Sequence, residues 1–326
     1  MATSQQTELF PIRVLSEKTT VGTSTLRAWE RRYGLLKPER TPKGHRLYTE
    51  ADVQKVLKII GLLNDGHTLP NIAEILSAKH ESHNTDIHNK FASGTDGKEA
   101  AMSSIWGGFI ESTLNATRDF NIERIDHVYN EASSLYPVDM VTDRLIQPTI
   151  QILGENWQKY PDRAIAEEHF YTSWLKNRLA ARFHHAYTHA RGARIICACL
   201  PGAYHEIGLM LFSLSALARG YRVLYFGADL PLNQLNYITQ RSAAKAVVLS
   251  AQTQINSDVN QQLPSLINEL SIPVFIGGSN KLIDNESFEN AGGILLGANT
   301  SVALKVFENH VPAYSSANNI NVTGQE

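Results

Sequence analysis

The spacing of apolar positions changes along the chain, and each stretch of one spacing predicts a different kind of element. Leu26 and Trp29 lie three residues apart, so they share one face of a short helix that we expect to end at Gly34. From residue 99 to residue 190, apolar residues recur at helical spacing in four segments. Beyond residue 193, short apolar runs alternate with helical segments. The pattern therefore predicts a multi-domain protein whose parts belong to different fold classes.

The C-terminal third has the pattern of alternating strands and helices. Five runs are short and almost wholly apolar, as is usual for strands that are buried on both faces. The predicted strands span residues 193–200, 221–227, 244–252, 272–278 and 292–298. A helical segment follows each run, and this alternation predicts a parallel, doubly wound α/β sheet of the flavodoxin-like, or Rossmann-like, type.

The middle of the chain has four amphipathic segments joined by short links, which predict a four-helix bundle. Pro148 lies inside the third segment and predicts a kink there. Residues 77–98 are polar and lack periodicity, which indicates a flexible linker with solvated histidines rather than a metal site. The predicted parts are an all-α winged head at 10–78, a linker at 79–98, the bundle at 99–190 and the α/β domain at 193–310.

Length and composition fit this division. A chain of 326 residues is long enough for two or three domains, and its 43% of hydrophobic residues can build their cores. No apolar run approaches the roughly 20 residues that a membrane-spanning helix needs, and the N-terminus lacks the pattern of a secretory signal. Cys197 and Cys199 fall in a predicted buried strand, where we expect reduced core thiols. These features predict a cytoplasmic protein without a membrane partner.

The charge of the chain is concentrated near its N-terminus. Between Phe10 and Tyr48 there are nine Lys and Arg residues and three Asp and Glu residues, whereas the whole chain has a formal net charge of -2. A compact basic region in a nearly neutral protein is typical of nucleic-acid binding. A solvated basic helix with a core tryptophan is the alternative interpretation of the same residues.

Candidate DNA contacts follow from the residue types in this basic region. Phosphate contacts are expected from Arg13, Lys18, Lys43 and Arg46. Base-edge contacts are expected from Thr25, Arg27, Arg31 and Tyr33. Three residues after the turn at 41–44 are expected along the DNA backbone or in the minor groove: His45, Arg46 and Tyr48.

The order of motifs over residues 10–78 resembles the DNA-binding domain of the MerR family of transcription regulators. The resemblance rests on a helix-turn-helix, the recognition segment STLRAWERRYGLL, the wing KGHRLY and a following helix that contains the pair Asp52-Val53. It implies a winged helix-turn-helix that binds double-stranded promoter DNA. It also implies self-association, as a dimer or a tetramer.

A candidate ligand site lies where the predicted strands end. Ligands of doubly wound sheets bind beyond the carboxyl ends of the strands, near the point where the strand order reverses. His205 and Gly208 lie in the first loop after a strand, and Ser250 ends the third predicted strand. Gly277 and Gly278 end the fourth, and glycine permits a close approach of ligand to backbone.

A helical bundle followed by this sheet resembles the cobalamin-binding module of methionine synthase, methylmalonyl-CoA mutase and the MerR-type cobalamin photoreceptor-repressors. In that family a DxHxxG or ExHxxG loop supplies the histidine that binds cobalt from below. The matching segment is AYHEIG, so His205 and Gly208 are present and Ala203 replaces the acid. The resemblance implies that His205 is the axial cobalt ligand. It also implies that Ser250, Gly277 and Gly278 surround the nucleotide tail of cobalamin.

A second match to the photoreceptor-repressors lies in the bundle. Those proteins carry a tryptophan about ten residues before a Glu-His pair, in a segment that covers the upper face of the corrin ring. The segment GENWQKYPDRAIAEEHF contains Trp157 followed by Glu168 and His169. In the light-sensing members a histidine follows the tryptophan, and here Gln158 stands in its place.

These resemblances lead to a main hypothesis and two alternatives. The main hypothesis is a DNA-binding transcription regulator that is controlled by cobalamin, with adenosylcobalamin as the expected form and light as a further input, acting through oligomerisation. The first alternative is a regulator whose cobalamin-type module has no cofactor and senses another signal or a protein partner. The second, a cobalamin enzyme fused to a DNA-binding head, is disfavoured because the chain has no room for a substrate barrel. We therefore predict no enzymatic activity and no catalytic residues.

Overall fold

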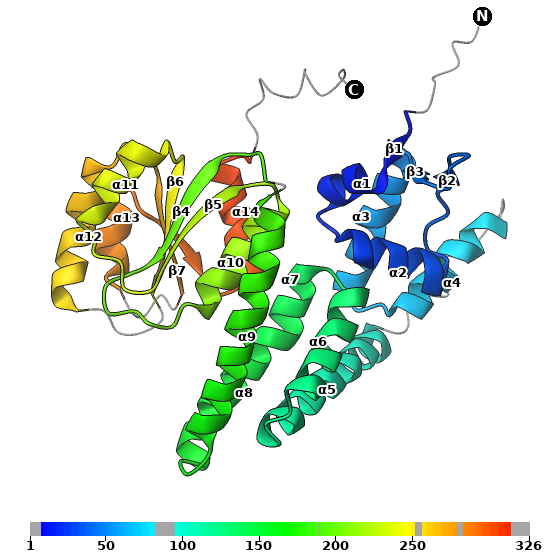
Figure 1. Ribbon diagram of the computed structural model, residues 1–326, viewed down its shortest axis with the longest axis horizontal. Coiled ribbons are helices and arrows are strands. Elements are labelled where there is room, and N and C mark those ends of the chain that lie inside the picture. The colour runs from blue at the N-terminus through cyan, green and yellow to red at the C-terminus, as the bar shows by residue number, and fades with distance from the viewer. Residues whose placement is uncertain (1–7, 82–94, 189, 252–255, 279–282, 314–326) are drawn as a thin grey trace, which may run out of the picture. The chain divides into compact units, whose positions relative to one another are not determined.

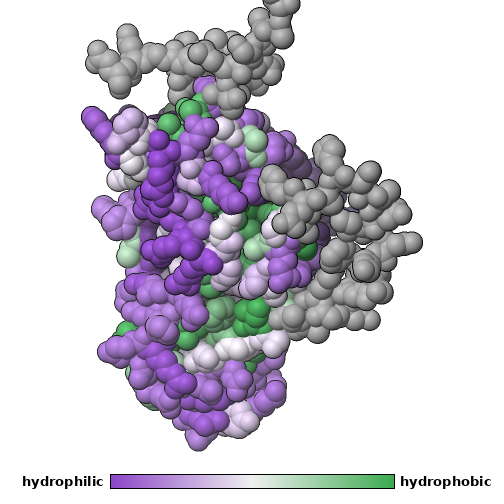
Figure 2. Space-filling model, turned by 90° about the vertical axis from the view of Figure 1, so that its right-hand side faces the viewer, coloured by the Kyte–Doolittle hydropathy of each residue, from purple (hydrophilic) through white to green (hydrophobic). Residues whose placement is uncertain are grey.

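The computed structural model describes residues 8–81, 95–188, 190–251, 256–278 and 283–313 (Figure 1). The chain divides into two compact units, residues 1–168 and residues 169–326. No helix among the described residues is both long and apolar enough to cross a bilayer. Hydrophilic residues cover most of the face drawn in Figure 2, with smaller hydrophobic areas between them.

The first unit begins with a winged helix-turn-helix, which we call the head. Its helices are α1 (Ile12–Thr19), α2 (Thr23–Tyr33), α3 (Glu50–Asn64) and α4 (Leu69–Glu81). Its short strands are β1 (Phe10–Pro11), β2 (Glu39–Arg40) and β3 (Arg46–Tyr48), which form an antiparallel sheet in the order β1-β3-β2. The predicted helix-turn-helix with a β-wing is therefore confirmed.

Local signals explain where the helices of the head begin and end. Gly34 takes the left-handed conformation, with φ of 62°, and terminates α2 as expected for a glycine after a helix. Thr49 and Asp52 form a reciprocal capping box at the start of α3. Leu15, Leu26 and Ile59 are fully buried, so α1, α2 and α3 share one small core.

The rest of the first unit is helical. It contains α5 (Thr95–Arg118), α6 (Ile122–Leu135), α7 (Val138–Val141), the π-helix η1 (Thr142–Ile146) and α8 (Gln147–Lys159). Because α4 extends to Glu81 and α5 begins at Thr95, both ends of the predicted linker are helical, and residues 82–94 lie outside the described residues. The fourth predicted helix, α9 (Ala164–Tyr187), begins in the first unit and continues into the second.

Pro148 lies at the start of a helix and not in its interior. The sequence predicts a kink at this residue, because proline has no N–H to donate to the carbonyl four residues earlier. The structure places Pro148 in the first turn of α8, directly after η1. There the N–H of Gln147 donates to the carbonyl of Thr142, five residues earlier. A wider helical turn therefore precedes the proline.

The second unit is a parallel sheet of five strands covered by helices. The strands are β4 (Arg194–Cys199), β5 (Arg222–Gly227), β6 (Ala246–Ala251), β7 (Val274–Gly278) and β8 (Ile294–Gly297), in the order β5-β4-β6-β7-β8. All four strand pairs are parallel. This order reverses beside β4, as in a flavodoxin-like sheet, so the predicted fold class is confirmed.

Helices cover both faces of this sheet (Figure 1). On one face lie α10 (Ile207–Ala218) and α14 (Thr300–His310), which contact each other. On the other face lie α11 (Gln234–Ser242), α12 (Ser257–Glu269) and α13 (Asn285–Asn290). Cys197 and Cys199 are free and buried, and burial raises the pKa of each thiol to about 12, so both are core thiols as predicted.

Candidate DNA-binding head and ligand pocket

One face of α2 carries two exposed arginines. Arg27 and Arg31 lie four residues apart, so they share this face, and both are exposed. Lys43 and His45 are also exposed, on the wing between β2 and β3. The structure therefore leaves the α2 face and the wing accessible to phosphate groups, as the sequence predicted.

Glu30 joins α2 to the wing. Its carboxylate accepts a hydrogen bond from Arg40 at 2.9 Å and another from Arg46 at 2.5 Å. The hydrogen bond from Arg46 to Glu30 raises the pKa of the Arg46 guanidinium, although burial acts in the opposite direction. Because two arginines on different strands meet one carboxylate, the wing is held against α2 in a defined position.

We expect Glu30→Gln to loosen the wing. The substitution removes the negative charge and leaves one oxygen to accept where two did, so one of the two hydrogen bonds is lost and the other loses its anionic partner. Amide hydrogen exchange in the segment 39–48, followed by mass spectrometry, should speed up roughly tenfold. Glu39→Gln, which alters an exposed acid of the same wing, is the matched control. Equal exchange rates in the two variants would contradict this role of Glu30.

The remaining predicted phosphate contacts are exposed but already paired with acids. Arg13 forms an ion pair with Glu17 at 3.7 Å, and Lys18 forms one with Glu50 at 2.6 Å. Pairs at such exposed positions contribute little and are easily exchanged for other partners. Both cations therefore stay candidates for phosphate contact.

Two predicted DNA contacts are buried in this conformation. Tyr48 is fully buried in β3, where it pairs with Phe10 of β1, and burial raises the pKa of its hydroxyl to about 12, so its side chain is not presented to DNA in this conformation. Tyr48 belongs to the core of the head. Thr25 is also buried, and its hydroxyl donates to the carbonyl of Ser133 on α6 at 3.3 Å.

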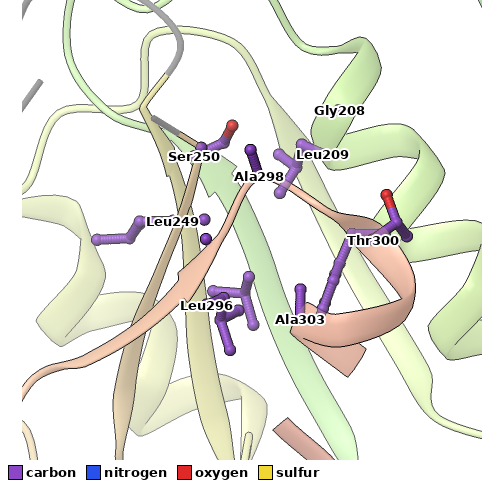
Figure 3. Close-up of a pocket in the computed structure, with 13 residues that line it drawn as sticks. Gly208, Leu209, Leu249, Ser250, Leu296, Ala298, Thr300 and Ala303 are labelled. Atoms are coloured by element: carbon purple, nitrogen blue, oxygen red, sulfur yellow. The ribbon is translucent and has the colours of Figure 1, made fainter. Parts of the chain in front are cut away.

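The second unit has a cavity at the carboxyl ends of its strands (Figure 3). The ends of β6, β7 and β8 and the first turns of α10 and α14 form its walls. Of the predicted site residues it includes Gly208, Ser250, Gly277 and Gly278. The cavity encloses about 40 Å³. Parallel strands bring their carboxyl ends to one edge of the sheet, which explains why these separated residues meet.

Glycine stands at each of the last two positions of β7 for a different structural reason. A Cβ added at Gly278 would lie 2.0 Å from the carbonyl oxygen of Ala251, and φ is 122°, so β6 and β7 themselves require glycine. A Cβ added at Gly277 would only reach ordinary contact, 3.7 Å from the carbonyl oxygen of Gly297. Gly277 is therefore the glycine whose missing side chain leaves space for a ligand.

Residues of β8 and α14 complete the cavity, and the sequence analysis did not identify them. Leu296 and Ala303 lie deep in the cavity, whereas Ala298 lies with Ser250 toward the strand ends (Figure 3). The segment GGILLGANT, which ends the fifth predicted strand, was the available signal. Its glycine and small residues repeat the pattern of the strand end at Gly277.

The loop that carries His205 is anchored from a neighbouring loop. His205 is exposed, and Ala203, which stands where the resemblance expects an acid, is buried. The carboxylate of Asp229, after β5, accepts a hydrogen bond from the backbone N–H of Gly202 at 2.8 Å and one from the Tyr204 hydroxyl at 3.4 Å. An acid from another loop therefore holds the backbone of Gly202 and the side chain of Tyr204, on either side of Ala203.

Glu206 directly follows His205 but serves other partners. Its carboxylate accepts a hydrogen bond from the Tyr225 hydroxyl at 2.9 Å and forms an ion pair with Lys176 of α9 at 3.1 Å. Burial and the nearby Glu206 both raise the pKa of Tyr225. With both oxygens engaged, Glu206 fastens α9 and β5 to the start of α10.

The predicted residues of the helical segment lie on α8 and α9. Trp157 is near the end of α8 with 40% of its surface exposed, so it is not a core aromatic of this unit. Glu168 is the last residue of the first unit, and His169 is the first residue of the second, where it is exposed. Trp157 and His205 belong to different units.

A basic winged helix-turn-helix and an α/β domain with a cavity at its strand ends together define a DNA-binding protein with a separate domain suited to a ligand. Residues 10–79 match the model of the MerR HTH family regulatory protein. The head therefore matches the MerR type of DNA-binding domain, and the chain is related to two transcriptional repressors over most of its length.

The relatives and a solved structure support the two halves of this description. The chain is 29% identical to the HTH-type transcriptional repressor CarH of Myxococcus xanthus, over 83% of this chain and 89% of CarH. It is 23% identical to the repressor CarA of the same organism, over 82% of this chain and 85% of CarA. The monomethylamine corrinoid protein of Methanosarcina barkeri aligns over 62% of this chain and 99% of its own, with a TM-score of 0.50 and 14% identity. The last likeness shows the fold alone.

Proposed function

We propose that this regulator binds cobalamin in its second unit, and that the cofactor controls promoter binding through oligomerisation. The observation that carries the proposal is the meeting of Gly208, Ser250 and Gly277 in one cavity at the sheet edge that also carries His205. An exposed imidazole next to a small, mostly apolar cavity suits a cofactor that needs one metal ligand and a slot for its tail.

Each of these residues has a defined part in the proposed site. His205 would hold the cobalt from below, and Asp229 would keep the loop of His205 in position. Ser250 would meet the base of the nucleotide tail, and Gly277 would leave room beside it. Because the cavity encloses only about 40 Å³, its rim must move apart for a base to enter. Trp157, Glu168 and His169 stay proposed cofactor contacts, as the sequence resemblance implies.

Control of DNA binding would then arise from the number of heads held together. Two linked heads bind neighbouring half-sites far more tightly than one head does, because the second binding step becomes intramolecular. Adenosylcobalamin is the proposed form, since it supplies a cobalt–carbon bond that green light breaks. A ligand that favours the associated state would raise promoter affinity, and its loss in light would lower it.

The test is to load the full chain with adenosylcobalamin in the dark. We expect a coloured protein whose size-exclusion profile shifts to a larger species, and whose promoter binding in a gel shift rises accordingly. Green light should reverse both changes. Ala298→Phe, which fills the exposed mouth of the cavity, should prevent loading without unfolding the chain. A wild-type chain that stays colourless would overturn the cofactor proposal.

A colourless chain would favour the alternative that the module has no cofactor and senses another signal or a protein partner. The observation in its favour is Ala203, which removes the acid expected beside the cobalt-binding histidine. A histidine on a metal is normally oriented by a carboxylate on its other nitrogen. A coloured chain of constant size in light and dark would instead indicate a chemical sensor of cobalamin.

A further inference from the structure

One side of α2 contacts the end of α6 within the first unit. Thr25, Trp29 and Tyr33 recur every four residues, so they lie on one side of the helix. The Trp29 indole N–H donates to the carbonyl of Leu135 at 2.8 Å, and the Thr25 hydroxyl donates to the carbonyl of Ser133. Burial raises the pKa of Tyr136 to about 12, and nearby Tyr33 adds to the increase.

The contact provides hydrogen-bond partners for carbonyls of α6 and for side-chain donors of α2. Ser133 and Leu135 are in the last turn of α6, where carbonyls have no partner within the helix. Trp29 is fully buried, and a buried indole N–H needs an acceptor. The contact is therefore specific, because separating the helices exposes an indole and leaves two carbonyls to water.

The contact covers one side of α2, and α2 is the helix that is expected to read DNA. In a helix-turn-helix, residues near the start of the second helix contact the base edges, and Thr25 lies in the first turn of α2. The major groove is about 12 Å wide and a helix with its side chains is about 10–12 Å across, so the groove admits one helix. We infer that the end of α6, held against the side of α2, keeps α2 from reaching the base edges fully.

We propose that the contact of Thr25 and Trp29 with the end of α6 is an autoinhibitory latch. In the latched state, the exposed Arg27 and Arg31 still attract phosphates, so the head binds DNA without reading its sequence. Release of α6 frees Thr25 and Tyr33 for base contacts. The latch lies within the first unit, so the proposal rests on the DNA-binding role of the head and not on the cofactor.

Ser133→Glu tests the latch from the α6 side and leaves the head unchanged. The Ser133 hydroxyl oxygen is buried in the same residue whose carbonyl accepts from Thr25, so a longer, charged side chain does not fit the present packing of this turn and should weaken the contact. The added negative charge is repelled by DNA, and any gain in affinity would therefore oppose simple electrostatics. Ser134→Glu is the matched control, because the Ser134 hydroxyl bonds only locally, to the carbonyl of Glu131.

The probe is a duplex that the wild-type full chain enriches from a random 30-base-pair pool, since the small unlatched fraction of the chain still selects by sequence. Binding is measured with and without poly(dI-dC) competitor. We expect Ser133→Glu to bind the enriched duplex about tenfold more tightly than Ser134→Glu, with equal affinity for the competitor. Size exclusion checks that the compared samples have the same oligomeric state. Affinity equal to or below that of Ser134→Glu would overturn the latch.

A substitution in the head tests the latch independently if Ser133→Glu does not fold. Trp29→Phe keeps most of the ring packing and removes only the indole donor to Leu135. Thermal unfolding should show that this variant is folded. A gain of affinity for the enriched duplex over wild type supports the latch, and unchanged or weaker binding overturns it. Cofactor loading should be the same in all variants, which separates this test from that of the proposed function.

Discussion

Replacing His205 with alanine should lower cobalamin affinity by on the order of 100-fold or more, because even residues that only orient a metal ligand change affinity 10- to 100-fold. His205 is exposed, so its loss should leave the fold intact. The measurement is the visible absorption that stays with the protein through gel filtration after loading in the dark.

His310→Ala is the matched control for this prediction. His310 is an exposed histidine at the end of α14, whereas the first turn of that helix lines the cavity. This variant should keep the cofactor and the absorption spectrum of the wild type. If His205→Ala also retained both, the assignment of His205 as the axial ligand would be wrong, although cobalamin binding itself would stand.

Removing the carboxylate of Asp229 should weaken cobalamin binding roughly tenfold, as expected for a residue that acts by positioning a metal ligand. Asp229 accepts a hydrogen bond from the backbone of Gly202 and has a φ of 54°, which most side chains disfavour. Asp229→Gly is therefore the informative change, because glycine adopts this conformation without strain. An equilibrium titration with cobalamin measures the effect.

Asp229→Asn removes the negative charge of Asp229 and keeps the size of its side chain, so it shows which of the two the loop needs. Asparagine tolerates the same backbone conformation and keeps an oxygen that can accept from Gly202. We expect this variant to lose less affinity than Asp229→Gly, and circular dichroism should show both variants folded. Full affinity in Asp229→Gly would show that the loop of His205 needs no anchor from β5.

Local sequence signals determined most of the elements. Gly34 predicted the end of α2, and the five apolar runs predicted the five strands β4 to β8. The cavity residues Gly208, Ser250 and Gly277 were also predictable, because a doubly wound sheet brings the ends of its strands together whatever their separation in the chain. The identity of the chain as a regulator rested on equally local motifs.

The tertiary structure alone decided which predicted residues are accessible and what holds the site together. Trp29 and Leu135 are 106 positions apart, so no local pattern could show that α6 covers Thr25 and the indole. Asp229 likewise acts on a loop 27 positions away. Periodicity reports which face of an element is apolar, but the partner of that face depends on packing between distant segments. The sequence determined the elements and their chemistry, and packing determined which of these residues meet.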